Sequence, residues 1–170
     1  TGVQTCALPI FGAGKEGRVY RLDKTRCIKY YNKDKYQRRE LAALRRGQND
    51  PLLPRLHEWG HGFVIREFIE GIPLSQYLAA HGLTSELAEK ILLMHETLIR
   101  LGYRRADLRL AHVILTPGGR LRIIDPTNMM KVDRTYPRKL LHDLASLGLK
   151  EEFLAWAERL RPRTYEEWAG

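Results

Sequence analysis

The sequence has few cysteines, no long apolar run and no repeated or low-complexity segment, and these absences exclude several classes of protein. Its two cysteines, Cys6 and Cys27, are too few for a disulfide framework and lack the spacing of a metal site. No stretch approaches the roughly 20 consecutive apolar residues that a membrane-spanning helix needs. A hydrophobic fraction of 44% with 29% charged residues is typical of a folded domain. With no recognisable signal peptide, we expect a reducing, cytoplasmic environment.

Acidic residues are outnumbered by basic ones. The chain has 29 Lys and Arg against 20 Asp and Glu, a formal net charge of +9. The excess is concentrated in the part up to Gly71, which holds 14 basic and 8 acidic residues. This balance suits a phosphate-rich partner such as a nucleotide, a nucleic acid or a lipid headgroup, and a basic surface that only keeps the protein soluble explains it equally well. Net charge alone therefore does not exclude nucleic acid, although no other feature favours it.

The first ten residues differ in character from the rest. The chain begins with Thr1 instead of methionine, and residues 1–10 (TGVQTCALPI) resemble translated sequencing-adapter sequence. We interpret residues 1–10 as a non-native leader and leave them out of the fold argument. A length of 170 residues fits one domain, or two small lobes that share a core. The expected division is an N-lobe over residues 11–70 and a C-lobe over residues 71–170.

Hydrophobic patterning predicts an α+β fold, with a strand-rich first half and a helical second half that contains one hairpin. The predicted strands cover residues 18–22, 27–31, 53–59, 63–68, 112–115 and 121–124. The predicted helices cover residues 35–46, 138–147 and 150–160, together with a long helix that Thr84 caps and Gly102 ends.

A glycine-rich stretch opens the first predicted hairpin. Residues 11–20 (FGAGKEGRVY) follow the pattern G-x-G-x-x-G-x-V, and glycines allow a loop to approach phosphates closely. A strand follows, whereas a dinucleotide-binding fold requires a helix there. Glu16 stands where a P-loop requires Ser or Thr. A glycine-rich hairpin without a ligand remains the alternative.

Three charged residues stand at positions that suggest chemistry. Lys29 lies inside an apolar strand, where its ammonium needs an anionic partner, and the following helix offers Glu40. A lysine that points to solvent from an edge strand is the alternative. Asp107 precedes one apolar strand and Asp125 ends the next, so the hairpin between them is expected to bring both carboxylates to one end. A carboxylate at such a strand end suits a hard cation.

From about Phe11 to Gly148, the chain resembles the protein-kinase-like superfamily. The glycine-rich stretch, the strand lysine, the helix glutamate and the two aspartates follow one another in the order typical of that family. The resemblance implies a small antiparallel-sheet N-lobe, a truncated helical C-lobe, and binding of ATP with Mg²⁺. The nucleotide-binding residues it implies are Gly12, Gly14, Gly17, Val19, Cys27, Lys29, Glu40, Glu67 and Ile69. The catalytic residues it implies are Asp107 as base, Lys29 on the α- and β-phosphates, and Arg109 on the transferred phosphoryl group. The implied metal ligands are Asp125 and His112.

Several positions depart from the family pattern. His112 replaces the catalytic-loop asparagine, and imidazole suits Mn²⁺ better than Mg²⁺. Ala106 replaces the arginine of H-R-D, and only a short segment separates Asp125 from Asp143, which matches the family's buried helix acid. The chain therefore resembles a compact bacterial, Rio-like serine/threonine kinase.

The resemblance predicts an ATP-dependent phosphotransferase that acts on a hydroxyl group. Arg109 matches a lysine of protein kinases, which favours a protein acceptor. A small-molecule or saccharide kinase is the first alternative, because the short segment after Asp125 leaves little platform for a peptide. A nucleotide-binding pseudokinase that serves as an interaction module is the second, suggested by His112 and Ala106.

A competing motif, H-E-x-x-H, starts at His57. It binds zinc only on a helix, where residues i and i+4 share a face. Pro54, Gly60 and Gly62 disfavour a helix here, and the alternation that follows predicts a strand pair. We therefore expect no zinc, with His57 and His61 facing solvent.

Overall fold

The computed structural model describes residues 10–103, 106–130 and 136–169, and within them an α+β fold. The strands are β1 (Ile10–Gly14), β2 (Gly17–Arg21), β3 (Arg26–Tyr31), β4 (Leu56–Gly60), β5 (Phe63–Glu67), β6 (Ile72–Pro73), β7 (Val113–Leu115) and β8 (Leu121–Ile123). The helices are α1 (Asp34–Arg46), α2 (Leu74–His81), α3 (Ser85–Arg100), α4 (Arg138–Ser146), α5 (Lys150–Leu160) and α6 (Pro162–Ala169), with a 3₁₀ turn at Leu110–His112. No helix in the described ranges has the length and apolar character needed to cross a bilayer.

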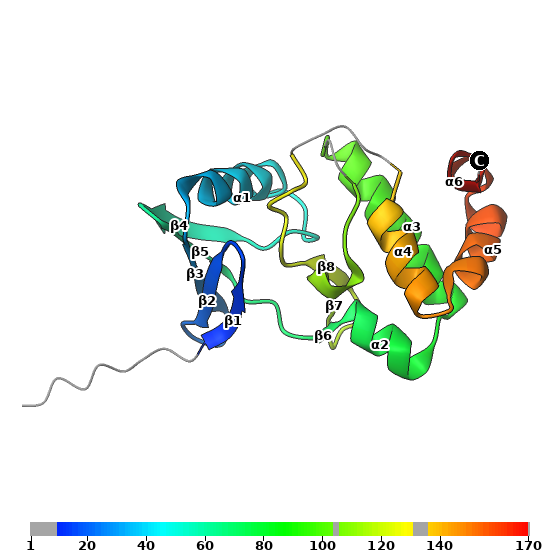
Figure 1. The fold of residues 1–170 in the computed structure, drawn as a ribbon, viewed down its shortest axis with the longest axis horizontal. Helices are drawn as coiled ribbons and strands as arrows, with labels where there is room; N and C mark the ends of the chain where they lie inside the picture. Colours follow the sequence, from blue (N-terminus) through cyan, green and yellow to red (C-terminus); the bar gives the residue numbers. More distant parts are fainter. Residues whose placement is uncertain (1–9, 104–105, 131–135, 170) are drawn as a thin grey trace, which may run out of the picture.

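The first half forms an antiparallel sheet in the order β1-β2-β3-β5-β4, and α1 packs against β3 and β5. The register pairs Lys29 with Val19 on one side and with Val64 on the other. Because side chains alternate between the faces of a sheet, Cys27, Lys29 and Tyr31 share one face of β3. α1 covers the sheet in Figure 1 and supplies the acidic partner of Lys29.

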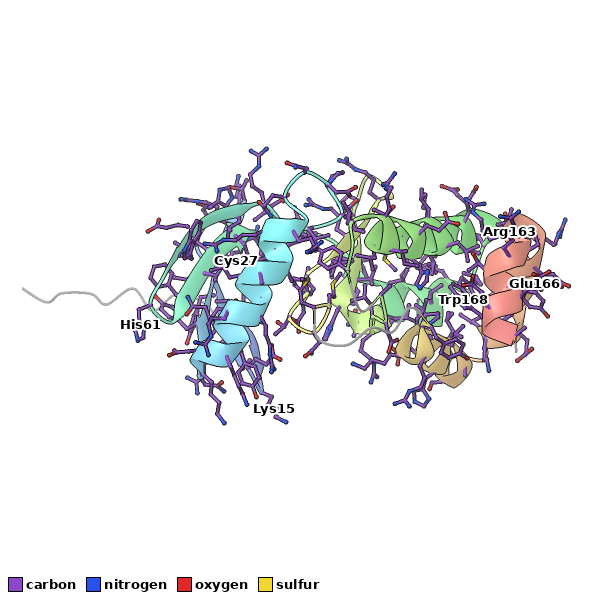
Figure 2. All side chains as sticks on the ribbon, turned by 90° about the horizontal axis from the view of Figure 1, so that it is seen from above. Lys15, Cys27, His61, Arg163, Glu166 and Trp168 are labelled. Atoms are coloured by element: carbon purple, nitrogen blue, oxygen red, sulfur yellow. The ribbon has the colours of Figure 1, made fainter. Side chains whose placement is uncertain are left out.

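The helical half is built around α3. The Thr84 hydroxyl accepts a hydrogen bond from the Leu87 N–H at 3.2 Å, which caps the helix as predicted. The buried stripe of α3 includes Leu87, Ala88, Ile91, Leu92, Met94 and Leu98. α5 packs on α3, and α6 packs on α5. Trp168 of α6, labelled in Figure 2, places its ring edge-on to His95 and stacks on Phe153, which closes the far end of the core.

A small sheet, in the order β6-β7-β8, lies between the five-stranded sheet and the long helices (Figure 1). The Ile123 N–H donates to the Leu52 carbonyl at 2.9 Å, so β8 is joined to the segment between α1 and β4. The Tyr103 hydroxyl, just after α3, donates to the Ala43 carbonyl of α1 at 2.6 Å. Ala43 and Leu52 also belong to the hydrophobic core around α3, so the two halves share one core.

The predicted α+β class is confirmed, and most predicted elements are present within a few residues of their expected ends. The elements of the described ranges that were not predicted are β1, β6, α2, α6 and the 3₁₀ turn. The proposed leader falls on residues outside the described ranges, except that its last residue, Ile10, pairs with Tyr20 in β1.

The H-E-x-x-H sequence lies on β4 and the turn that follows it, which confirms the predicted strand pair. His57 and His61 are both exposed. Gly62 adopts a positive φ of 79°, a conformation that glycine takes at little steric cost. The helical arrangement that a zinc-binding H-E-x-x-H requires is therefore not formed here.

Candidate functional site

A buried ion pair joins the five-stranded sheet to α1. Lys29 Nζ lies 2.5 Å from Glu40 Oε2. Lys29 is 6% exposed and Glu40 is 0% exposed. Glu40 occupies the buried stripe of α1 with Tyr36, Ala43 and Leu44, at helical spacing. The prediction that Glu40 is the partner of Lys29 is confirmed, and the alternative of a solvent-facing lysine is wrong.

Glu40 has two further partners. Arg66 Nε, on β5, lies 3.4 Å from Glu40 Oε1, and the Thr127 hydroxyl lies 3.2 Å from Glu40 Oε2. Burial of Arg66 opposes its charge, but nearby acidic groups such as Glu40 outweigh this effect, so the pKa of Arg66 lies above the ordinary value. Sequence reasoning missed Arg66 and Thr127. The alternation of β5 could have indicated Arg66, because it places Val64 and Arg66 on the same buried face.

The two oxygens of the Asp125 carboxylate have different partners. Oδ1 accepts a hydrogen bond from the Thr127 hydroxyl at 2.7 Å and lies 3.8 Å from Lys29 Nζ. Oδ2 lies 3.8 Å from His112 Nδ1. Burial raises the pKa of Asp125, but Lys29, the Thr127 hydroxyl and His112 lower it more, so the carboxyl titrates below its usual range. The β7–β8 hairpin thus brings the two predicted metal ligands together.

A carboxylate oxygen and an imidazole nitrogen that face each other can bind one divalent cation. The donor set of Asp125 and His112 therefore fits a divalent metal ion.

Glu16, Glu40 and Asp125 offer oxygen atoms that all lie within 4.8 Å of one another. Lys29 Nζ is 3.8 Å from Glu16, 2.5 Å from Glu40 and 3.8 Å from Asp125, so its ammonium lies among these acids. We therefore assign this acidic triangle to Lys29. Glu16 comes from the turn of the glycine-rich hairpin, which places that turn over the lysine.

The glycine-rich hairpin, β1 and β2, borders a cavity of about 860 Å³. The cavity is lined by Ala13, Gly14, Gly17, Arg18, Tyr20, Tyr30, Tyr31 and Asn32. The Asn32 side chain donates to the Lys15 carbonyl at 2.6 Å, and the Asn32 N–H donates to the Glu16 carbonyl at 3.1 Å. These bonds tie the turn to the end of β3. Figure 2 shows Lys15 at the outer end of the hairpin.

The segment predicted to contact an adenine base follows β5. The Glu67 carbonyl lies 3.7 Å from Cys27 Sγ, on the same side of the sheet as Lys29. Burial raises the pKa of the Cys27 thiol, so the thiol stays neutral. The Glu67 side chain points elsewhere, to the Arg122 guanidinium at 2.6 and 2.8 Å, and this hydrogen-bonded pair lowers its pKa. Ile69 is buried.

Asp107 and Arg109 are engaged with α4. Asp107 is 4% exposed, and its Oδ1 accepts a hydrogen bond from the Lys139 N–H, in the first turn of α4, at 2.6 Å. Arg109 Nε donates to Asp143 Oδ2 at 2.9 Å, and the same oxygen accepts from the Leu110 N–H at 2.9 Å. Asp143, which the resemblance matches to the family's helix acid, therefore holds the segment after Asp107. The structure thus brings together Lys29, Glu40, Asp125 and His112. Asp107 and Arg109 instead make these hydrogen bonds with residues of α4.

No protein-family model and no curated protein matches the sequence. Among solved structures, the fold is similar to monomeric WbdD, with a TM-score of 0.63 and 17% identity over 90% of this chain and 42% of that chain. WbdD bound to the kinase inhibitor LY294002 matches with a TM-score of 0.56 and 17% identity, over 89% of this chain and 37% of that one. The complex of Rv3197 from Mycobacterium tuberculosis with erythromycin matches with a TM-score of 0.54 and 19% identity, over 89% of this chain and 53% of that one.

These likenesses show a kinase-like fold. The chain spans between about a third and about a half of the length of these structures.

Proposed function

We propose that this chain is a two-lobed, ATP-dependent phosphotransferase that binds ATP with a divalent cation where the sheet half meets the helical half. The observation that carries the proposal is one cluster, in which Lys29 of β3 meets Glu40 of α1 and Asp125 after β8. The kinase-like fold supports this assignment. The acceptor we favour is a serine or threonine hydroxyl of a protein.

Each residue of the cluster has a distinct role in this proposal. Lys29 would bind the α- and β-phosphates, with Glu40 fixing the direction of its ammonium. Gly12, Gly14 and Gly17 would let the hairpin backbone approach the phosphates, and the Glu67 carbonyl would accept from the adenine. Asp125 and His112 would hold the cation, which neutralises phosphate charge. Asp107 would accept the proton of the attacking hydroxyl, while Arg109 would stabilise the phosphoryl group in transfer.

The first experiment measures ATP binding and turnover on the whole chain. A ligand that binds only the native state stabilises it by about 2.7 kcal/mol at 100 times its Kd, so ATP with Mg²⁺ or Mn²⁺ should raise Tm by several degrees. Lys29→Ala should abolish turnover and reduce the shift in Tm. Undiminished turnover in Lys29→Ala would show that the assignment of Lys29 is wrong.

A specific observation favours a second candidate, a nucleotide-binding pseudokinase. The carboxylate of Asp107 is buried against α4, and Arg109 is held by Asp143, so both groups have other partners. A module of this kind would bind ATP through Lys29 and Asp125 without transferring phosphate. Binding of ATP without turnover, with any divalent cation, would select this function over the enzyme.

The acceptor class needs a separate comparison, because a saccharide or another small molecule also carries hydroxyl groups. A panel of serine- and threonine-containing peptides, tested beside a panel of sugars, separates the two enzymes. Phosphorylation of sugars alone would overturn the protein-kinase proposal and retain the phosphotransferase.

A further inference from the structure

Arg66 is a buried arginine at the centre of the candidate site. It lies on β5 and is 5% exposed. Its guanidinium reaches two other segments of the chain and the neighbouring residue of its own strand. Nε lies 3.4 Å from Glu40 Oε1, Nη2 donates to the Ile124 carbonyl at 2.9 Å, and Nη1 donates to the Glu67 carbonyl at 3.4 Å.

The charge of Glu40 does not by itself explain Arg66. Glu40 is already paired with Lys29 at 2.5 Å, so a second buried cation adds the cost of its own desolvation. What Arg66 adds is the bond to Ile124, the residue before Asp125. A planar guanidinium donates in several fixed directions at once, which a single ammonium cannot do. Arg66 is thus suited to fix the positions of segments relative to one another.

We propose that Arg66 is a positioning residue, which fixes the backbone that carries Asp125 relative to the Lys29–Glu40 pair. This inference rests on the proposed function, because it gives Arg66 a role in placing the cation-binding and phosphate-binding groups. Thr127 provides a second tie, since its hydroxyl bonds to Asp125 Oδ1 and lies next to Glu40. Arg66 acts on the backbone before Asp125, and Thr127 acts on its side chain.

The test compares Arg66→Met, Arg66→Lys and a matched control, Arg122→Met. Arg122 is also a largely buried arginine, and its guanidinium donates to the Glu67 side chain and to the Leu53 carbonyl. Neither contact is made with Glu40 or with the Ile124 carbonyl. Arg122→Met therefore removes a comparable guanidinium without removing the tie to Asp125.

The first measurement is amide hydrogen exchange over residues 124–130, without any ligand. The Ile124 N–H donates to the His112 carbonyl and the Met129 N–H donates to the Pro126 carbonyl, so these amides report on the order of the segment. We expect exchange to be at least ten times faster in Arg66→Met and unchanged in Arg122→Met. Arg66→Lys keeps the charge and should recover Tm in part, but exchange should remain fast. Arg66→Lys also provides a folded variant if Arg66→Met does not fold.

The second measurement separates binding of the cation from binding of ATP. With ATP saturating, Arg66→Met or Arg66→Lys should need about ten times more Mg²⁺ or Mn²⁺ for half-maximal turnover, while KM for ATP changes less than threefold. Equal acceleration of exchange in the Arg66 variants and in Arg122→Met would overturn the inference, as would no acceleration at all. If the parent protein binds no nucleotide, the proposed function fails on its own, and the exchange result still decides whether Arg66 fixes the Asp125 segment.

Discussion

At the scale of single residues, glycines of the same hairpin have different reasons to be there. A Cβ atom at Gly17 would lie 1.9 Å from the Tyr30 carbonyl oxygen, so the pairing of β2 with β3 requires glycine. A Cβ atom at Gly12 or Gly14 would meet nothing within 4 Å, and neither residue has a positive φ. The fold does not require glycine at these two positions. In the proposed function, these two glycines let a ligand approach the hairpin backbone closely.

Substitution of two glycines tests this difference. Gly14→Ala should change the free energy of unfolding by less than about 0.5 kcal/mol, as for an unstrained surface position. Under the proposed function it should weaken ATP binding about tenfold, because an added methyl group would hinder close approach of the phosphates to the hairpin backbone. Gly17→Ala should lower stability by about 1–3 kcal/mol, as for an overpacked site. Thermal denaturation and nucleotide titration measure both effects, and a Gly14→Ala as unstable as Gly17→Ala would contradict this explanation.

At the scale of elements, local residue types were sufficient for β2, β3, α1, α3 and the β7–β8 hairpin. The strands are rich in β-branched and aromatic or apolar residues, and the two helices consist of helix formers followed by a glycine. α2 was not predicted, since it has eight residues, begins after Pro73 and has no side-chain cap. The Lys29–Glu40 pair was predictable because both residues lie in adjacent elements. The hydrogen bond from Arg66 to the Ile124 carbonyl was not predictable, because the two residues lie 58 positions apart in the sequence.

The position of Asp107 at the start of α4 was also not predictable, because α4 begins about 30 residues later in the sequence. Its carboxylate accepts from the Lys139 N–H, and its charge lies at the positive end of the helix dipole. Pro137, at the N-cap position, contributes no side-chain bond. In this structure Asp107 therefore serves α4 as a cap supplied from a distant segment.

Two substitutions separate capping from chemistry at this residue. Asp107→Ala removes the acceptor and should cost about 1 kcal/mol, or about 3 °C in Tm. Asp107→Asn retains an oxygen acceptor and should cost less. If Asp107 is also the proposed base, both variants should lose turnover equally. Calorimetry beside a turnover assay distinguishes the effects, and equal Tm values for Asp107→Ala and the parent would show that the cap is not used.

At the scale of the whole molecule, a few polar contacts cross between the sheet half and the helical half. They include the Tyr103 hydroxyl on the Ala43 carbonyl, the Arg122–Glu67 pair, and the contact of Lys29 with Asp125. Two of these contacts contain an acid whose pKa its neighbours lower, Glu67 beside Arg122 and Asp125 beside Lys29. Acid should therefore weaken the junction at these two points before the apolar core is affected.

The sign of this pH effect follows from the lowered pKa of Asp125. Burial raises this pKa, but Lys29, Thr127 and His112 together lower it more. An unfolded aspartate titrates near about 3.9, so the folded carboxyl stays charged to lower pH than the unfolded one. Its contribution to stability is complete above about pH 4 to 5 and is lost as the pH falls through the folded pKa. Asp125→Asn should therefore lower Tm at pH 7 and lose less additional Tm than the parent between pH 5 and pH 3. Parallel Tm profiles for the two proteins over that range would show that Asp125 is not held charged by the junction, and a steeper fall in Asp125→Asn would reverse the assigned sign.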